Sequence, residues 1–490
     1  MTSKGLLKSF GAVLDVFHGF TFLFEFKVNL AEGKFNETSN TCPKIEQLTG
    51  SFALSNLIRF LDLSTSEISA DQILREIPRA ALDLDSAVEI IRPLVEKIRT
   101  GGARAIKKIA SEIDGIYIDP IRVSEEELKS ALANLEPKLR ASLELAIERV
   151  RKVSLQSVPK GFSTELAPGA TVSQRYQPID SVGLYVPGGK AVYPSSVIMN
   201  VVPALAAGVK KIAIATPGQA AFGGRPHPTV LATAELLGIR DVYTIGGPAA
   251  VIAFAYGVPE IGLEPVNLVT GPGNVYVAAA KRMLRGVIAI DSEAGPTEIM
   301  VLADDSADAA FVAADLISQA EHDEQAAAVL VSDSREFIDK VALELAKQVD
   351  AAPNKSRILE ALKGQQSALV LVKDSDSAAK IADIYATEHL SIQTRQNDHL
   401  ASQISNAGAI FLGSFSPVSL GDYLAGSNHV LPTGGQARFG SGLGVHTFLR
   451  PQQVIEYSET ALSEVSTNVV AIADSEGLEA HGEAIKIRFQ

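Results

Sequence analysis

The stretch SVGLYVPGGKAVYPSSVIMNVVPALAAGVKKIAIAT, residues 181–216, decides the fold class. It begins with a short β-branched run, passes through a glycine-containing turn and an alanine-containing apolar stretch, and ends in a second apolar run. Short apolar runs separated by helical patterns are typical of buried parallel strands with crossover helices. Further runs follow at 241–246, 266–271, 298–304, 326–332, 367–373, 390–394 and 408–413. The sequence therefore predicts an α/β protein with parallel sheets.

The region before this stretch has a different pattern. Residues 56–160 are predicted to be helical, because apolar residues recur at helical spacing between 88 and 98. Pro93 predicts a kink or a split in that run, and Gly101-Gly102 is expected to end it. The sequence SEEE at 124–127 is typical of a capping box that opens another helix.

The composition excludes several classes of protein. The chain has 490 residues, of which 46% are hydrophobic and 21% charged, as in globular proteins and unlike disordered ones. A formal charge of −13, an aromatic content of 6% and the absence of tryptophan disfavour nucleic-acid binding. The single cysteine, Cys42, excludes an internal disulfide framework and thiolate-built zinc or iron–sulfur sites. Any metal site must therefore use His, Asp, Glu or amide ligands.

No segment is typical of a membrane span or a targeting peptide. The most apolar of the long uncharged stretches, 191–209, is interrupted by two prolines, an asparagine and a glycine. Residues 1–55 contain no arginine, several acidic residues, and no small-residue cleavage site after their apolar segment. We expect an unassigned N-terminal extension on a cytoplasmic protein without membrane contact.

Glycines cluster after several of the expected strands, at 187–189, 246–247 and 271–274. Ligands of open α/β sheets bind beyond the carboxyl ends of strands, where main-chain amides can approach phosphates. A complete G-x-G-x-x-G is absent, because Tyr276 stands where the third glycine would follow GPG at 271–273. The glycines alone leave two explanations open, ordinary turns or a nucleotide site, and turns are the commoner.

Two pairs of side chains are candidates for chemistry. Gln319 and His322 lie at the end of an expected amphipathic helix, 308–320, where positions three apart share a face and can converge on one ion. The alternative is a histidine that simply favours the helix dipole. Glu388 and His389 offer two proton acceptors with ordinary pKa values of about 4.3 and about 6.5, which suits general-base catalysis. The alternative for this pair is a polar turn.

Other features of the sequence narrow the reaction class. The H-E-x-x-H motif of zinc proteases and the G-x-S-x-G nucleophile elbow are both missing from the sequence. The polar, glycine-bounded stretch 421–429 follows an expected strand, where functional loops tend to lie. His481, near the C-terminus, is expected to be a surface residue unless the tail docks.

Six motifs, in this order along the chain, resemble those of one known family. They are GLYVPGG (183–189), GPGN (271–274), AGPTE (294–298), SQAEH (318–322), TEHL (387–390) and GDYLAGSNHVLPT (421–433). Together they resemble histidinol dehydrogenase, over roughly residues 75–490. The last two motifs are the most specific, and residues 1–55 lie outside the resemblance.

The resemblance implies an α/β fold of two incomplete Rossmann-like domains, with a helical N-terminal segment and a C-terminal dimer-crossing tail. The implied parts are an unassigned extension, a helical segment with the first part of a discontinuous α/β domain, a Rossmann-like NAD-side domain, the second part of the discontinuous domain, and the tail. Their boundaries are 1–55, 56–184, 185–298, 299–445 and 446–490. The implied assembly is a homodimer with a shared active site.

The implied activity is oxidation of L-histidinol to L-histidine, the last step of histidine biosynthesis, by two hydride transfers to NAD through the aldehyde. His389 is then the general base, and Glu388 activates the water that hydrates the aldehyde. One Zn²⁺ per subunit is implied, on positions matching Gln319, His322, Asp422 and His481 of the partner subunit. Substrate-binding positions match Thr297, Gln319, His322, His389, Asp422, His429, Glu476 and His481, and cofactor-binding positions match Tyr185 and Asn274.

Two positions depart from the family pattern. Thr297 stands where the family commonly has serine, and it keeps the hydroxyl. Ala249 replaces a glutamine that contacts NAD in the family. The loss of one such hydrogen bond costs about 0.5–1.5 kcal/mol, so we expect weaker NAD binding rather than a different reaction.

Three alternatives stay open beside this interpretation. A related zinc- and NAD-dependent dehydrogenase could act on another amino alcohol or hydroxy acid. A non-catalytic or regulatory α/β protein could keep the fold, but the retention of Glu388, His389 and every zinc-ligand position disfavours it. A zinc hydrolase is disfavoured by the glycine-rich strand ends and by the missing water-activating carboxylate motif.

Overall fold

A computed structural model describes residues 57–65, 69–80, 83–188 and 192–490. By its internal contacts the chain divides into two units, Met1–Thr49 and Gly50–Gln490, and every element described below belongs to the second. The expected extension 1–55, with Cys42, lies outside the described residues. Within the described ranges, no helix is both long and apolar enough to cross a membrane.

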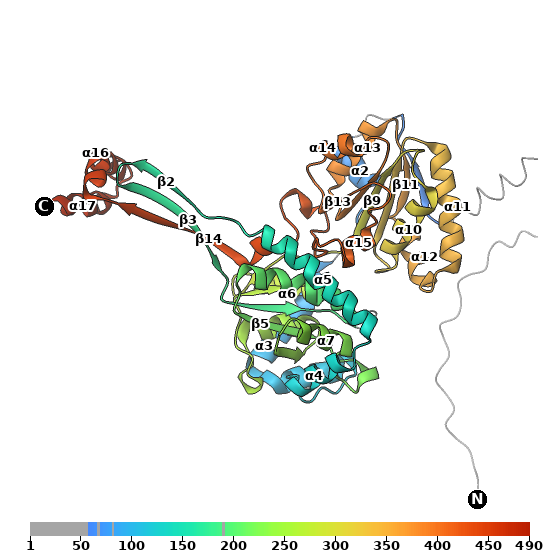
Figure 1. The fold of residues 1–490 in the computed structure, drawn as a ribbon, viewed down its shortest axis with the longest axis horizontal. Helices are drawn as coiled ribbons and strands as arrows, with labels where there is room; N and C mark the ends of the chain where they lie inside the picture. The colour runs from blue at the N-terminus through green and yellow to red at the C-terminus, as the bar shows by residue number, and fades with distance from the viewer. Residues whose placement is uncertain (1–56, 66–68, 81–82, 189–191) are drawn as a thin grey trace, which may run out of the picture. The chain divides into compact units, whose positions relative to one another are not determined.

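Two parallel β-sheets organise the second unit (Figure 1). The six-stranded sheet has the order β1-β11-β10-β9-β12-β13, and its strands are β1 Arg59–Asp62, β9 Glu298–Ala303, β10 Ala327–Ser332, β11 Ala368–Leu371, β12 His389–Gln393 and β13 Ala409–Leu412. The five-stranded sheet has the order β6-β5-β4-β7-β8, and its strands are β4 Ser181–Tyr185, β5 Lys211–Thr216, β6 Asp241–Thr244, β7 Leu268–Thr270 and β8 Ala289–Ile290. All neighbouring strands in both sheets run parallel.

Helices cover both faces of the six-stranded sheet, because alternate residues of its strands point to opposite sides. Ile299 and Val301 pack in one core with helices α10 Ala309–Ala320, α11 Arg335–Ala351 and α12 Lys355–Lys363. Met300 and Leu302 pack in the other core with α2 Ala70–Glu76, α13 Ser375–Tyr385 and α14 Asn397–Ser402. Both faces of this sheet are therefore buried under helices, which explains why the sequences of these strands are continuous apolar runs.

The five-stranded sheet is covered in the same way. Val182 and Leu184 of β4 face a core shared with α4 Glu125–Ala133, α5 Pro137–Gln156, α6 Pro194–Ala207 and α7 Pro228–Leu236. Ala213 and Ala215 of β5 face the opposite core, with α3 Leu84–Ile109, α8 Gly247–Tyr256 and α9 Val275–Leu284. The helices of 84–156 thus pack on this sheet, and the domain boundaries inferred from the sequence stay predictions.

The structure confirms the predicted α/β class with parallel strands. All nine apolar runs that predicted strands coincide with parallel strands, β4 to β7 and β9 to β13. The prediction that residues 56–160 are wholly helical is wrong at β1, which pairs with β11 at the sheet edge. This strand is only four residues long and alternates half-buried with exposed side chains, so its pattern is too short to distinguish from a helical one.

The predicted helix signals are largely confirmed. Ser124 and Glu127 form the capping box, with each side chain bonded to the other residue's main-chain amide. In α3 the non-helical dihedral angles lie at Gly102 (φ 51°, ψ −136°) rather than at Pro93. Helical geometry resumes after Gly102, so the glycine interrupts this helix where the sequence predicted its end.

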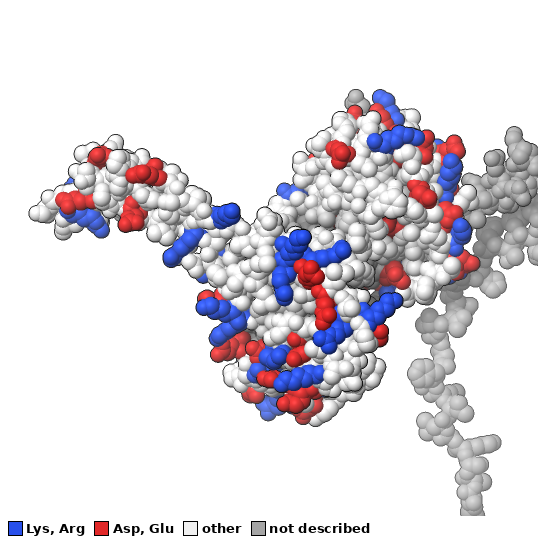
Figure 2. Space-filling model, in the orientation of Figure 1, with Lys and Arg blue, Asp and Glu red and all other residues white. Residues whose placement is uncertain are grey.

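A third sheet is antiparallel and was not predicted. β2 Phe162–Ala167, β3 Ala170–Pro178 and β14 Leu449–Tyr457 pair in the order β14-β3-β2. Figure 1 shows this ribbon leading to helices α16 Glu459–Ser475 and α17 Glu479–Lys486 at its outer end. The ribbon and these helices, residues 162–178 and 449–490, are here called the arm. The arm carries large apolar side chains that are exposed on this chain: Phe162, Leu166, Ile455, Ile472 and Ile487. Acidic and basic side chains are intermixed on the face drawn in Figure 2.

Candidate active site

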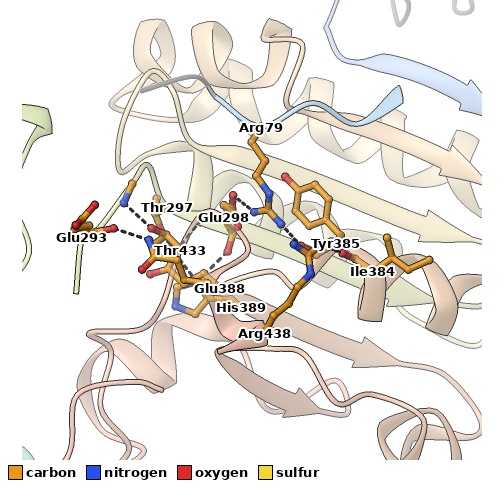
Figure 3. Close-up of polar contacts among 12 residues, drawn as sticks. Arg79, Glu293, Thr297, Glu298, Ile384, Tyr385, Glu388, His389, Thr433 and Arg438 are labelled. Atoms are coloured by element: carbon orange, nitrogen blue, oxygen red, sulfur yellow. Dashed lines mark hydrogen bonds and ion pairs between the residues drawn. The ribbon is translucent and has the colours of Figure 1, made fainter. Parts of the chain in front are cut away.

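The amino edge of the six-stranded sheet, where its strands begin, holds a cluster of bonded polar side chains (Figure 3). Thr297 directly precedes β9, and Glu388 directly precedes the neighbouring strand β12, which begins at His389. The Thr297 hydroxyl donates to Glu388 Oε2, and the Glu298 main-chain N–H donates to the same oxygen at 2.9 Å. Glu388 and His389 are only 6% and 5% exposed, so the pair is shielded from bulk solvent.

The hydrogen bonds of His389 assign its tautomer. Its Nδ1 lies 3.1 Å from the carbonyl oxygen of Glu298 and 3.4 Å from Glu388 Oε2. Because a carbonyl only accepts, Nδ1 carries the proton in the neutral ring, and Nε2 is the free base. This is the arrangement that a general base requires.

The two members of this pair shift each other's pKa values. Burial disfavours the Glu388 carboxylate, but His389 and the Thr297 and Glu298 hydrogen bonds outweigh burial and lower the pKa of Glu388. Burial likewise disfavours the His389 cation, but the Glu388 carboxylate outweighs it and raises the pKa of His389. The pair therefore favours a charged carboxylate beside an imidazole that protonates readily.

Gln319, His322, Asp422 and His429 adjoin this pair. Gln319, buried on α10, donates through Nε2 to the Thr297 hydroxyl, while its buried Oε1 has no hydrogen-bond partner. His322 Nε2 lies 3.9 Å from Oδ2 of Asp422, on α15 Val418–Tyr423. His429 Nδ1 lies 2.9 Å from the Asp422 carbonyl oxygen, and burial lowers the pKa of His429.

The side chains of Gln319, His322 and Asp422 are the possible metal ligands in this cluster. Across the described residues, no three His, Cys, Asp or Glu side chains are grouped as a metal site. Among the expected ligand positions, one chain brings together one imidazole, of His322, and one carboxylate, of Asp422. The third ligand from the same chain would be the amide oxygen of Gln319. The orphaned oxygen of Gln319 is the observation that favours an ion, since buried polar atoms normally have partners. The residues present therefore fit a nitrogen- and oxygen-liganded divalent metal.

The two predicted cofactor residues lie elsewhere, at the carboxyl edge of the five-stranded sheet. Tyr185 ends β4, and its buried hydroxyl accepts a 2.9 Å bond from the Gly247 N–H. Burial raises the pKa of Tyr185 to about 12. Asn274 caps α9, with Oδ1 accepting from Tyr276 and Val277 main-chain amides. The glycine turns at 246–247 and 271–274 lie at the same edge of the sheet.

A buried ion pair fixes the turn before Asn274. Lys281 Nζ donates to the Gly271 carbonyl at 2.5 Å and to Asp291 Oδ1 at 2.6 Å. Asp291 Oδ2 in turn accepts from the Gly271 N–H at 2.8 Å. Gly271 has φ +114°, and a side chain there would collide with the carbonyl of Tyr185. Two charged residues and one glycine therefore hold the turn against β4.

Glu476 and His481 are not brought to the cluster within one chain. Glu476 is the C-cap of α16 and His481 lies in α17, and both are exposed at the outer end of the arm. The structure thus gathers seven of the predicted site residues at the amino edge: Thr297, Gln319, His322, Glu388, His389, Asp422 and His429.

Sequence reasoning missed the charged residues that support these sites. They are Arg79, Glu298, Lys281 and Asp291. Lys281 follows a run of three alanines in an otherwise apolar helix face, which was an available signal for a buried cation. Arg79 had no signal, because its partner Glu298 is 219 residues away.

Comparisons with known proteins agree with the geometry. A family model described as histidinol dehydrogenase matches residues 77–489. The chain is 54% identical over 413 residues to the histidinol dehydrogenase of Thermobifida fusca (strain YX), covering 84% of this chain and 94% of that protein. It is 53% identical over 416 residues to that of Leifsonia xyli subsp. xyli (strain CTCB07), covering 85% and 95%. Among solved structures, a crystal structure of histidinol dehydrogenase from Elizabethkingia anophelis matches with a TM-score of 0.82 and 31% identity, covering 88% of this chain and 98% of that one.

Proposed function

Because this chain belongs to the histidinol dehydrogenase family, we propose that it oxidises L-histidinol to L-histidine with NAD, the last step of histidine biosynthesis. Two successive hydride transfers pass through the aldehyde. The observation that carries the proposal is the buried pair of Glu388 and His389, bonded to Thr297 and Glu298 at the amino edge. Two acceptors with different environments suit a reaction that needs two different proton transfers.

His389 is the base in both oxidations. Its Nδ1 is engaged by the Glu298 carbonyl, so Nε2 accepts the hydroxyl proton of the substrate as hydride leaves the same carbon. The bond broken is C–H, and its electron pair goes to NAD while the oxygen's electrons form the carbonyl. The Glu388 carboxylate stabilises the resulting imidazolium from 3.4 Å.

Glu388 acts between the two hydride transfers. Its recorded hydrogen bonds from Thr297 and Glu298 both use Oε2, which leaves Oε1 to take a proton from water. The water oxygen bonds to the aldehyde carbon, and the carbonyl π electrons move to the carbonyl oxygen, which takes the proton held on His389 Nε2, while Glu388 passes its proton to solvent. This gives the hydrate and leaves His389 neutral for the second oxidation. That hydrate presents a second C–H and a second O–H, so the second hydride transfer repeats the first and yields the acid.

A zinc ion is part of the proposal. Gln319, His322 and Asp422 would hold it, and the orphaned Oε1 of Gln319 supports that assignment. When bound, zinc supplies positive charge that orients the imidazole and amino nitrogens of the substrate. Thr297 and His429 complete the substrate pocket from this chain, and Thr297 links Gln319 to Glu388 by hydrogen bonds.

We place NAD at the carboxyl edge of the five-stranded sheet. Tyr185 and Asn274 lie there, and the glycine turns at 246–247 and 271–274 follow β6 and β7 at the same edge, where ligands of α/β sheets usually bind. A contact between the residues of this edge and those of the amino edge of the six-stranded sheet supports one active site that includes both. His429 Nε2 lies 3.4 Å from Oγ of Ser196, which belongs to α6, the helix that follows β4.

The assembly we propose is a homodimer whose sites are shared. The arm exposes large apolar side chains, including Ile455 and Ile472, which is typical of a surface that another chain covers. His481 and Glu476 lie on that arm. In this arrangement, His481 of the partner subunit completes the zinc ligands and Glu476 of the partner subunit contacts the substrate.

The test is NADH production by purified, zinc-loaded protein. Histidinol is supplied beside other amino alcohols and a hydroxy acid, and we expect two NADH per histidinol and no comparable turnover of the others. Turnover of another amino alcohol without turnover of histidinol would reject the assignment and favour a related dehydrogenase on the same fold.

The shared site has its own test in zinc content. We expect His481→Asn to lower bound zinc without unfolding the chain, because the exposed side chain supports no fold contact of its own. His399→Asn, which alters an exposed histidine on α14, is the control. Full zinc retention by His481→Asn would contradict the shared-site arrangement.

A further inference from the structure

A buried ion pair lies directly behind Glu388 and His389 (Figure 3). We propose that the ion pair of Arg79 and Glu298 is a positioning device, which holds the carboxylate and the imidazole at their working separation. This inference rests on the proposed function of that site. Neither residue is assigned to the reaction itself.

The main chain of residue 298 touches both catalytic side chains. Its N–H donates to Glu388 Oε2 at 2.9 Å, and its carbonyl oxygen accepts from His389 Nδ1 at 3.1 Å. A displacement of the main chain at this one residue would therefore move the acceptor that selects the His389 tautomer and the donor that steadies Glu388.

The side chain of Arg79 links residue 298 to the segment preceding Glu388. Its guanidinium donates to the Glu298 carboxylate and to the carbonyl of Tyr385, and it stacks 4.0 Å from the centroid of the Tyr385 ring. Tyr385 ends α13, three residues before Glu388. One cation thus ties the start of β9 to the approach to β12.

The turn that it ties is itself constrained. Ala386 has φ 53°, and it is the one non-glycine residue with positive φ among those that the structure describes. A left-handed conformation is unfavourable for a residue with a side chain, so surrounding contacts must enforce it. The bonds of Arg79 to Tyr385 and of Arg438 to the Ile384 carbonyl act on the residues just before it.

The ion pair is buried on one side and open to a cavity on the other. The Glu298 side chain is 5% exposed and that of Arg79 is 19% exposed. A cavity of about 220 Å³ borders both, lined also by Gln325 and Gln436. An unpaired side chain would therefore have room to move into the cavity, so we expect loss of position before loss of the fold.

The matched control is a second arginine with the same kind of contacts. Arg225 bonds the Glu127 carboxylate and the Pro120 carbonyl, and its side chain is also 19% exposed. Arg225 precedes α7 and bonds to α4, and both helices pack on the five-stranded sheet. Arg225→Met therefore reports the general cost of breaking such a contact away from Glu388.

The experiment compares Arg79→Met, Glu298→Gln, the double variant and Arg225→Met in the zinc-loaded full chain. We expect each single variant at the pair to lower kcat by about tenfold to a hundredfold, since small misplacements cost that much, with KM for histidinol and zinc content little changed. The double variant removes both charges. It should regain thermal stability, because no unpaired buried charge remains, yet keep the low kcat.

The outcomes separate this inference from the proposed function. If the unaltered chain fails to oxidise histidinol, the proposed function fails first. If it succeeds, wild-type kcat in the single variants overturns the positioning role. Recovery of kcat in the double variant, or an equal loss in Arg225→Met, also overturns it, because either result reduces the ion pair to a contribution to stability.

Discussion

The two parallel sheets present opposite edges to the reaction. The five-stranded sheet offers its carboxyl edge, with Tyr185 and Asn274, whereas the six-stranded sheet offers its amino edge, with Thr297, Glu388 and His389. Ligands of α/β sheets usually bind at carboxyl edges, where helix amino ends and glycine turns present N–H groups. The amino edge instead presents the side chains of Glu388 and His389, which residues at the start of the adjacent strand hold in place.

The difference matches the task proposed for each edge. A dinucleotide needs main-chain groups that can approach its phosphates closely, and glycines at the ends of strands permit that approach. Proton transfer needs two or three side chains held within a few tenths of an ångström, and strand pairing supplies that precision. At the amino edge, the main-chain groups of residue 298 bind the side chains of Glu388 and His389 rather than a ligand.

The largest expected effect lies at the amino edge. His389→Asn removes the base, so we expect kcat to fall by about 10²–10⁴-fold while NAD affinity is retained. Steady-state NADH production and a separate NAD titration check the two parts, with His399→Asn as the exposed control. A kcat within a few-fold of the unaltered protein would break the assignment of chemistry to this edge.

The next effect lies at the carboxyl edge. Lys281→Met leaves Asp291 buried without its cation, and breaking such a pair costs about 3–5 kcal/mol. We expect a lower unfolding midpoint in urea and a higher KM for NAD, with KM for histidinol unchanged. A folded variant with unaltered KM for NAD would show that the clamped turn at 271–274 does not bind the cofactor.

A pH profile sharpens the comparison further. The Glu388 carboxylate overcomes burial and raises the pKa of His389, so Glu388→Gln lets burial dominate and lowers that pKa. The base is active when neutral. The acidic limb of the first hydride transfer should therefore move to lower pH, measured as the NADH burst in a single turnover, because the variant blocks the second step. A limb that stays in place or moves to higher pH would mean that Glu388 does not control His389.

The smallest effect concerns the departure at Ala249. This residue lies in the first turn of α8 and is 5% exposed, beside the Gly246-Gly247 turn. Ala249→Gln restores the amide that the family commonly has, worth about 0.5–1.5 kcal/mol, and KM for NAD should fall by about twofold to tenfold. Unchanged or weaker NAD binding would mean that this chain has no space for the amide.

Nine of the eleven strands in the two parallel sheets could be predicted, because buried parallel strands are short, continuous apolar runs. The strand β8 was not predicted, because it has only two residues. The edge strand β1 and the arm were missed for the opposite reason, since exposed strands carry mixed polar and apolar residues. In the site, spacing alone raised only the pairs Gln319 with His322 and Glu388 with His389. The stretch 421–429 was predicted as a functional loop, and the resemblance supplied Thr297 and the roles of Asp422 and His429.

The ion pair of Arg79 and Glu298 could not be predicted from the sequence. Arg79 and Glu298 meet only because β9 and the segment after α2 come together in the folded chain. Their spacing in sequence carries no signal, and each residue alone reads as an ordinary surface charge. Tertiary structure alone reveals that residue 298 contacts both catalytic side chains.

The arm has a consequence for inheritance. Under the proposed shared site, a subunit lacking His389 can still lend an intact arm, and a subunit lacking His481 can still lend an intact amino edge. A cell that expresses both defective alleles would therefore assemble mixed dimers in which one site is whole and the other carries both lesions. Two alleles that each abolish growth without histidine would restore it together.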